Sequence, residues 1–213
     1  MTKIKLCGLM QPQDVLAANA LLPAFVGFVF AKESRRAVTA KQAAELKALL
    51  DPRIQAVGVF VNDKTERVAD LLEQRIIDIA QLHGDEGEPY IRRLKAITLC
   101  PVIKAFCLGA LQANEPFKEE KAAGEDWTNA IEACGADYVL LDSGKGSGMR
   151  FSWELAKRIK RPYFLAGGLD PDNAAEAVRL LHPFAVDVSS GIETDGAKDA
   201  KKMETFCRAV REA

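Results

Sequence analysis

Two residues that each close an apolar run could carry acid–base chemistry. Cys7 ends the run Ile4–Cys7 and is followed by Gly8. A free thiol ionises only ~1.5 units above neutral pH, so it can act as a base or a nucleophile. Most free cysteines are instead small buried hydrophobic residues, and this alternative applies to Cys7. Asp142 ends the run Tyr138–Asp142. A carboxylate at the end of a buried strand has three alternative roles: to cap a helix, to pair with a cation, or to act as an acid–base group with a shifted pKa.

Further polar residues lie in or after other apolar runs. Asp187 lies within Ala185–Val188, where an unpaired charge would be costly, so it is expected to face a pocket or a hydrogen-bonded partner. His83 follows a run that ends in Leu82. In the pair Arg35 and Arg36, one guanidinium aimed into a pocket would bind a carboxylate through two hydrogen bonds, whereas solvated surface arginines are the alternative.

Glycine-rich turns follow the last three apolar runs of the chain. They are Gly146-Ser147-Gly148, Gly167-Gly168 and Ser190-Gly191. Glycine lets backbone N–H groups approach an anion closely, although ordinary turns between strands and helices also favour glycine. The chain has no Walker A motif and no G-x-G-x-x-G after its first run, which argues against a nucleotide. A sugar phosphate is the expected ligand.

The elements that would position these residues alternate regularly. Helical patterns separate eight short apolar runs, which are Ile4–Cys7, Phe25–Phe30, Ala56–Val61, Ile77–Leu82, Val102–Phe106, Tyr138–Asp142, Tyr163–Ala166 and Ala185–Val188. Several helices have recognisable starts: Thr39 with Gln42 and Asp63 with Glu66 have capping-box spacing, and Asp170 precedes Pro171 as an N-cap. In the last helical pattern, Cys207 occupies an apolar position and is expected to pack in the core.

Eight strand–helix units in 213 residues predict a small (β/α)₈ barrel formed as a single domain over residues 1–213. A doubly wound open sheet is the alternative, although it more usually stops at five or six strands. The segment near 107–127 holds a polar insertion, Leu111–Asp126, which is expected to be an extended surface loop or an extra helix. In a barrel, the residues that end the strands gather at one face.

Composition narrows the function further. A net charge of −1 gives no electrostatic case for nucleic acid or an anionic membrane, and no apolar run approaches the ~20 residues of a membrane span. The two histidines make a zinc or iron site improbable. Five cysteines without a C-x-x-C pair fit reduced thiols, and the polar N-terminus has no apolar signal core, so a cytoplasmic protein is expected.

Together these motifs resemble the phosphoribosylanthranilate isomerase family, which are barrel enzymes of tryptophan biosynthesis. The resemblance covers nearly the whole chain in order. It is carried by Lys5–Leu9, Gly27–Phe30, Ser34–Arg36, Val57–Val61, Gln81–Gly84, Leu140–Ser143, Gly146–Gly148, Leu165–Leu169 and Val186–Glu193.

The resemblance implies a cofactor-free Amadori rearrangement of a small phosphosugar–anthranilate substrate. By this likeness, Asp142 is the general acid and Cys7 is the general base. Arg36 would hold the anthranilate carboxylate, and Gly146, Gly148, Gly167, Gly168, Ser190 and Gly191 would bind the phosphate. His83 and Asp187 would complete the pocket. A monomer and a homodimer are both compatible with the sequence.

One departure and three rival functions stay open. The family usually has proline where this chain has Arg35, so either Arg35 or Arg36 could bind the carboxylate. The related histidine-pathway isomerase usually has two aspartates as its acid–base pair. It also has two similar phosphate loops, one in each half of the chain, whereas the first half of this chain has no loop equivalent to Leu165–Leu169. A non-catalytic phosphosugar-binding barrel would require neither Cys7 nor Asp142. A redox role for Cys7 would need a resolving cysteine, and none is near in sequence.

Overall fold

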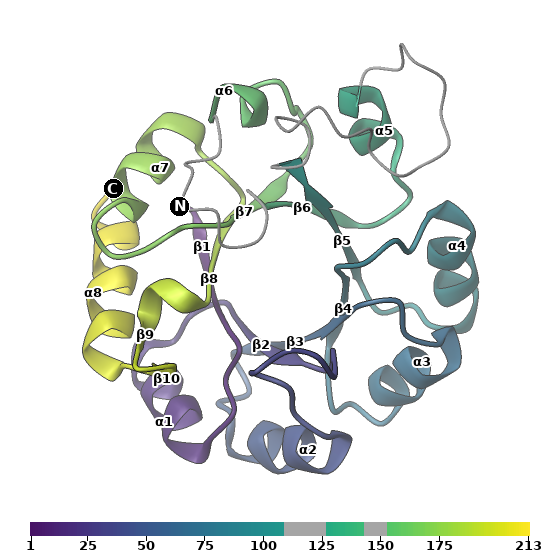
Figure 1. Ribbon diagram of the computed structural model, residues 1–213, viewed down its shortest axis with the longest axis horizontal. Helices are drawn as coiled ribbons and strands as arrows, with labels where there is room; N and C mark the ends of the chain where they lie inside the picture. Colours follow the sequence, from purple (N-terminus) through teal and green to yellow (C-terminus); the bar gives the residue numbers. More distant parts are fainter. Residues whose placement is uncertain (109–126, 143–152) are drawn as a thin grey trace.

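A computed structural model describes residues 1–108, 127–142 and 153–213. Within these ranges, eight parallel strands close into a barrel because β8 pairs back onto β1 (Figure 1). The closed barrel confirms the predicted (β/α)₈ fold over the open sheet. The strands are β1 (Lys3–Cys7), β2 (Phe25–Val29), β3 (Gln55–Phe60), β4 (Ile79–Leu82), β5 (Val102–Cys107), β6 (Tyr138–Asp142), β7 (Tyr163–Ala166) and β8 (Ala185–Val188).

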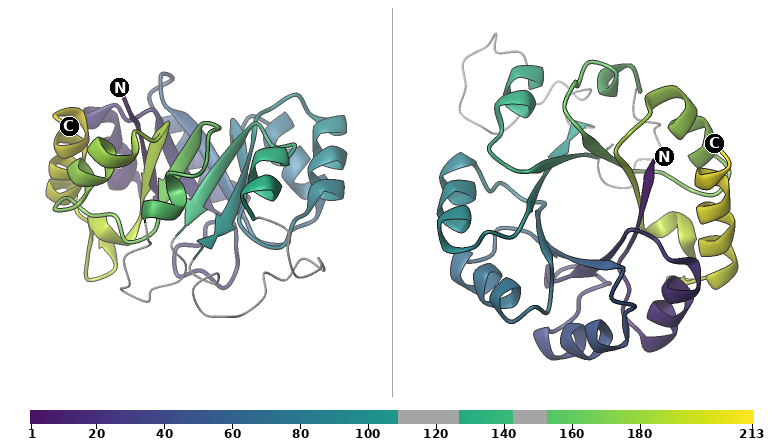
Figure 2. Two further views of the ribbon diagram at one scale, coloured as in Figure 1. Left: turned by 90° about the horizontal axis from the view of Figure 1, so that it is seen from above. Right: turned by 180° about the vertical axis from the view of Figure 1, so that it is seen from behind.

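Helices surround the barrel on its outer side (Figure 2). They are α1 (Pro12–Leu21), α2 (Ala40–Leu49), α3 (Thr65–Glu73), α4 (Glu88–Ile97), α5 (Trp127–Ala133), α6 (Trp153–Ala156), α7 (Ala174–Leu181) and α8 (Ala200–Arg211). No helix in the described ranges is long and apolar enough to cross a membrane.

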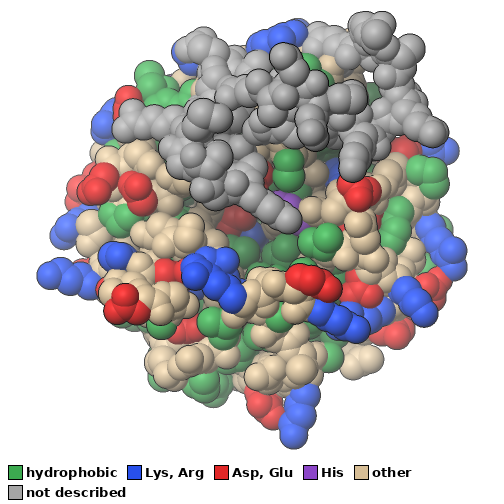
Figure 3. All heavy atoms as spheres, viewed as in Figure 1, with side chains coloured by type: hydrophobic (Ala, Val, Ile, Leu, Met, Phe, Trp, Pro, Cys, Tyr) green, Lys and Arg blue, Asp and Glu red, His purple; other side chains and the backbone are tan. Residues whose placement is uncertain are grey.

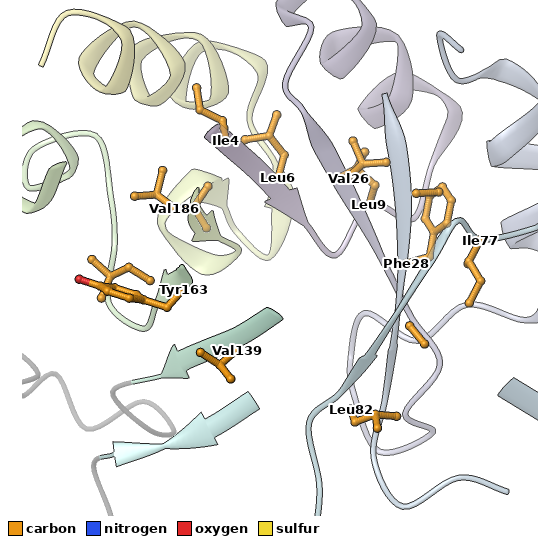
Figure 4. Packing of buried hydrophobic residues seen from close by; sticks show 14 of the residues in the cluster. Ile4, Leu6, Leu9, Val26, Phe28, Ile77, Leu82, Val139, Tyr163 and Val186 are labelled. Carbon is orange, nitrogen blue, oxygen red and sulfur yellow. The ribbon is translucent and has the colours of Figure 1, made fainter. Parts of the chain in front are cut away.

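The alternation of side chains along each strand produces two cores. On β1, Ile4 and Leu6 face the helices and join the outer core (Figure 4). Residues of opposite parity, such as Phe25, Val57 and Phe164, form a second buried cluster that fills the barrel interior. Lys5 and Cys7 alternate with Ile4 and Leu6, so their side chains face this interior.

The helix starts agree with the sequence only in part. Thr39 caps α2 as predicted: its Oγ1 accepts the Gln42 N–H at 3.2 Å, and the Gln42 side chain accepts the Thr39 N–H at 2.9 Å. The predicted capping box of Asp63 and Glu66 is wrong. The N-cap of α3 is Lys64, which makes no side-chain cap; Asp63 accepts the N–H of Lys64 and binds Arg67, and Glu66 binds Arg93, so the two carboxylates do not form the reciprocal pair of a capping box.

The predicted start of α7 is also displaced. The carboxylate of Asp170 accepts the N–H groups of Asp172 and Asn173, which closes a turn, and the helix begins afterwards at Ala174. The fourth strand likewise begins at Ile79, two residues later than predicted. Cys207 packs in the core as predicted and is 1 % exposed.

Two predicted loops lie largely outside the described residues. Cys107 ends β5 and Trp127 begins α5, and residues 109–126 of the predicted extended loop are not described. Gly146, Ser147 and Gly148 are also outside the described residues. After β8, a short 3₁₀ helix (η2, Ser190–Ile192) leads into an antiparallel hairpin of β9 (Glu193–Thr194) and β10 (Ala197–Lys198), which the sequence analysis did not predict.

Candidate active site

A pocket opens at the carboxyl ends of the barrel strands. Figure 3 shows a central hollow on this face, with a histidine side chain inside it. The pocket is lined by Cys7, Arg36, Val59, Gln81, His83, Asp142, Ala166, Gly167, Gly168, Leu169, Asp187, Val188, Ser189 and Ser190. Eight of the predicted site residues, Cys7, Arg36, His83, Asp142, Gly167, Gly168, Asp187 and Ser190, therefore meet in one place.

Two glycines make space for side chains of the pocket, one for Cys7 and one for Arg36. A Cβ atom on Gly27, the residue that pairs with Cys7 on β2, would lie 2.5 Å from the Cys7 Sγ. Gly8 has a φ of +81°, which glycine adopts without strain, and a Cβ there would lie 2.5 Å from the Cδ of Arg36. Cys7 is 8 % exposed and lines the pocket, so its thiol can contact a ligand.

A buried ion pair lies next to Cys7 in the barrel interior. Lys5 is fully buried, and its Nζ donates to Oδ2 of Asp187 at 2.8 Å. The other oxygen, Oδ1, has no hydrogen-bond partner among the described residues. Burial raises the pKa of Cys7 overall, although the positive charges of Lys5 and Lys198 oppose this shift. Burial alone would lower the pKa of Lys5, but the charges of Asp187 and Cys7, together with hydrogen bonds to both side chains, raise the pKa overall, so Lys5 stays protonated.

On the other side of the pocket, His83 connects two polar residues. Its Nε2 lies 3.2 Å from Oδ2 of Asp142, and its Nδ1 lies 2.9 Å from the amide nitrogen of Gln81. Burial disfavours the imidazolium, but hydrogen bonding and the charge of Asp142, together with Cys107, raise the pKa of His83 to about 9. The imidazole is therefore protonated at neutral pH. Its Nδ1–H then needs an acceptor, which the Gln81 amide supplies by presenting its Oε1, an atom with no other hydrogen-bond partner among the described residues.

Glu193 holds both arginines of the predicted carboxylate-binding loop. The Nε of Arg36 donates to its Oε1 at 2.6 Å, and a terminal nitrogen of Arg36 donates to Oε2 at 2.8 Å. Arg35 and Lys198 bind the same carboxylate, each at 2.7 Å. Burial of Glu193 opposes its ionisation, yet Arg36 and Lys198 lower its pKa to about 2. Three cations against one carboxylate leave an excess of positive charge beside the pocket.

The two arginines differ in their access to the pocket. The side chain of Arg36 is 18 % exposed and lines the pocket, whereas that of Arg35 is 61 % exposed and does not. This geometry favours Arg36 over Arg35 as the residue that contacts a bound anion.

The loops after β7 and β8 pack directly against each other. A Cβ on Gly191 would lie 2.0 Å from the carbonyl oxygen of Leu169, so only glycine fits there. Gly167, Gly168 and Ser190 line the pocket beside this contact, and Gly191 directly follows Ser190 in the chain. Among the described residues, no group of three or more His, Cys, Asp or Glu side chains could hold a metal ion.

Sequence reasoning missed four residues that line the pocket or contact its lining. Lys5, Gln81, Glu193 and Lys198 had no assigned role. A signal existed for Lys5, because it is a charged residue two positions before Cys7 in a buried strand and so shares its face. Glu193 and Lys198 had no such signal, because they contact the pocket through an unpredicted hairpin.

Comparison with known proteins agrees with this geometry. Residues 4–209 match the family described as N-(5'phosphoribosyl)anthranilate (PRA) isomerase. An N-(5'-phosphoribosyl)anthranilate isomerase from Endomicrobium trichonymphae is 42 % identical, and the match covers 99 % of both chains.

The chain belongs to the phosphoribosylanthranilate isomerase family.

Solved structures of this isomerase family share the barrel. That of the Thermotoga maritima phosphoribosyl anthranilate isomerase is 31 % identical, with a TM-score of 0.84 and complete coverage of both chains. Another phosphoribosyl anthranilate isomerase, 29 % identical with a TM-score of 0.79 and complete coverage of both chains, was solved in complex with reduced 1-(o-carboxyphenylamino)-1-deoxyribulose 5-phosphate. The predicted family and enzyme class, an isomerase of tryptophan biosynthesis, are thereby confirmed.

Proposed function

We propose that the chain converts N-(5-phosphoribosyl)anthranilate into 1-(2-carboxyphenylamino)-1-deoxyribulose 5-phosphate, with Asp142 as general acid and Cys7 as general base. The observation that carries this proposal is the meeting of Cys7, from β1, and Asp142, from β6, in one pocket. The pocket also contains an arginine and two glycine-bearing loops. These groups match the three parts of the substrate: a reacting sugar, a carboxylate and a phosphate.

The reaction begins with ring opening. Asp142 donates a proton to the ribose ring oxygen while the bond between that oxygen and C1 breaks. The lone pair of the anthranilate nitrogen forms a C1=N double bond, which gives an iminium ion. A positioned general acid contributes typically about 100- to 10,000-fold to such a step.

Proton abstraction follows at C2. The Cys7 thiolate takes the C2 proton, the electrons of the C–H bond form C1=C2, and the electrons of the C=N bond return to nitrogen. The resulting enolamine loses its hydroxyl proton and gains a proton at C1, which yields the ketone. Protons taken up and released balance, as an isomerisation requires.

His83 is the proposed source of the proton that Asp142 donates. Because its pKa is raised to about 9, His83 carries a proton at neutral pH that it can give to Asp142. The hydrogen bond between Nε2 and Oδ2 lets that proton pass to Asp142 as the ring opens. We assign His83 the role of keeping Asp142 supplied with a proton between turnovers.

Substrate binding uses the charged and glycine-rich sides of the pocket. Arg36, fixed by Glu193, would hold the anthranilate carboxylate by charge-assisted hydrogen bonds. Gly167, Gly168, Ser190 and Gly191 would hold the phosphate through backbone N–H groups and the serine hydroxyl. Gly146 and Gly148 are assigned the same role from sequence, although they lie outside the described residues.

The experiment generates phosphoribosylanthranilate in situ, adds the purified chain, and follows the decay of substrate fluorescence. The control is the double variant Cys7→Ser, Asp142→Asn. Rapid decay with the parent alone is the expected result. Absence of decay with the parent would reject the proposed substrate, and turnover of the histidine-pathway substrate instead would favour the rival isomerase.

A further inference from the structure

A buried cation that the proposed mechanism does not use lies in the barrel interior beside the pocket. Lys5 lies two residues before Cys7 on β1, and the two side chains share the inner face of the barrel. We propose that Lys5 is a positioning residue: its ammonium group, held by Asp187, stabilises the Cys7 thiolate in the free enzyme. This inference rests on the proposed function only in the use that the reaction makes of the thiolate.

The closure of the barrel fixes the location of the ammonium group. Lys5 and Asp187 are direct partners in the register between β1 and β8, and their side chains meet at 2.8 Å. Neighbouring residues on β1 face the other way, since Ile4 and Leu6 belong to the core beneath the helices (Figure 4). Lys5 therefore cannot turn towards solvent, and its charge stays beside Cys7.

The burial of this pair calls for a reason other than stability. Lys5 is fully buried and Asp187 is 8 % exposed. Removing two such charges from water is costly, and well-packed hydrophobic residues often replace a buried ion pair without loss of stability. Moreover, Oδ1 of Asp187 has no hydrogen-bond partner among the described residues, so the pair is not a fully satisfied structural network. A role in the adjacent pocket accounts for its presence.

The charges around Cys7 have different effects on its ionisation. Burial of the thiol is the largest influence and raises its pKa. Next in size, the charge of Lys5 lowers the pKa, and this effect exceeds the opposite effect of Asp187. Lys198 on β10 also lowers it, while Arg36 faces Cys7 from the loop after β2. Within this set, Lys5 makes the largest contribution that favours the thiolate.

The ion pair acts without donating or accepting a proton in the reaction. When the thiolate removes the C2 proton, an S–H bond forms and a C–H bond breaks, and Lys5 stays protonated throughout. Asp187 has two opposing effects on Cys7. Its negative charge directly disfavours the thiolate, but it also keeps Lys5 charged and fixed in place. Removing both members should therefore leave Cys7 harder to ionise, because the effect of Lys5 is the larger one.

The test measures the ionisation of Cys7 in the free enzyme. Iodoacetamide modifies thiolates, so the rate at which it labels the peptide containing Cys7, followed by mass spectrometry against pH, reports the thiolate fraction. The variants are Lys5→Met, Lys5→Arg and the double variant Lys5→Met, Asp187→Asn. The double variant leaves no unpaired buried charge, so it carries the test if Lys5→Met alone does not fold. Lys3→Met is the matched control, because Lys3 lies over the rings of Phe25 and Phe184 at the other end of β1.

We expect the labelling midpoint to move to higher pH in the double variant, with labelling at pH 7 slowed by about tenfold. Lys5→Arg and Lys3→Met should label like the parent. An unchanged midpoint in the folded double variant would overturn the inference. The result does not depend on turnover: a shifted midpoint in a chain that leaves phosphoribosylanthranilate unchanged would reject the proposed function alone, whereas turnover by the parent without a shift would reject the role of Lys5 alone.

Discussion

The imidazole Nε2 of His83 lies 3.2 Å from Oδ2 of Asp142, across 59 positions of sequence. His83 follows β4 and Asp142 ends β6, so the barrel itself brings the two residues together. Together with Cys107, this contact raises the pKa of His83 to about 9, so His83 is a proton donor beside the proposed acid.

The His83 contact predicts how stability depends on pH. The pKa of His83 is higher in the folded chain than its ordinary value of 6.5. The contact therefore stabilises the fold fully below pH 6.5, and this stabilisation disappears as the pH rises through about 9. Urea unfolding of the parent and of His83→Gln should differ most at pH 6 and converge near pH 10. A difference that grows with pH would contradict the assigned ionisation.

Replacing Arg36 should weaken substrate binding more than it slows chemistry. Loss of a charge-assisted bond of about 1.5–3 kcal/mol corresponds to a KM increase of roughly 10- to 150-fold in Arg36→Ala. Arg35→Ala is the matched control and should stay near the parental KM, because its side chain is largely exposed outside the pocket. Steady-state kinetics of both variants would decide between them, and a KM increase in Arg35→Ala alone would reverse the assignment.

A methyl group at Gly27 should interfere with the thiol directly. Its Cβ would lie 2.5 Å from the Sγ of Cys7, so Gly27→Ala should displace the base and reduce kcat by at least tenfold. Gly58→Ala is a suitable control, because its Cβ would lie 2.6 Å from the Cδ1 of Ile77, in the outer core. Both should lose about 1–3 kcal/mol of unfolding free energy through overpacking. Equal kcat values in the two variants would show that the space around Cys7 is not critical.

Much of the fold could be predicted because the barrel signal is local. Each strand is a short apolar run, and the eight runs recur at a spacing that suits strand–helix units. Helix starts were less predictable, since a carboxylate with capping-box spacing, such as Asp63, can bind a nearby arginine instead. The Thr39 cap was predicted correctly because the side-chain oxygen of Gln42 accepts the backbone N–H of Thr39 three positions earlier, as the capping-box spacing predicts.

The site residues at the strand ends could be predicted from the sequence, but their contact partners could not. Cys7, His83, Asp142 and Asp187 are visible in sequence because each lies in or directly after an apolar run. The partners that tune the pocket are separated from these residues along the chain. Lys5 and Asp187 are 182 positions apart, and Arg36 and Glu193 are 157 positions apart. Only the closure of the barrel and the hairpin after β8 identifies such contacts.

The most direct test of the account is the single-turnover rate of the isomerisation in the parent, Cys7→Ser and Asp142→Asn, measured beside the affinity of each for the product. We predict that each substitution slows turnover by about 100-fold or more, while product affinity stays within a few-fold of the parent, because binding depends on Arg36 and the glycine-bearing loops. A near-parental rate in either variant would contradict the assigned acid and base.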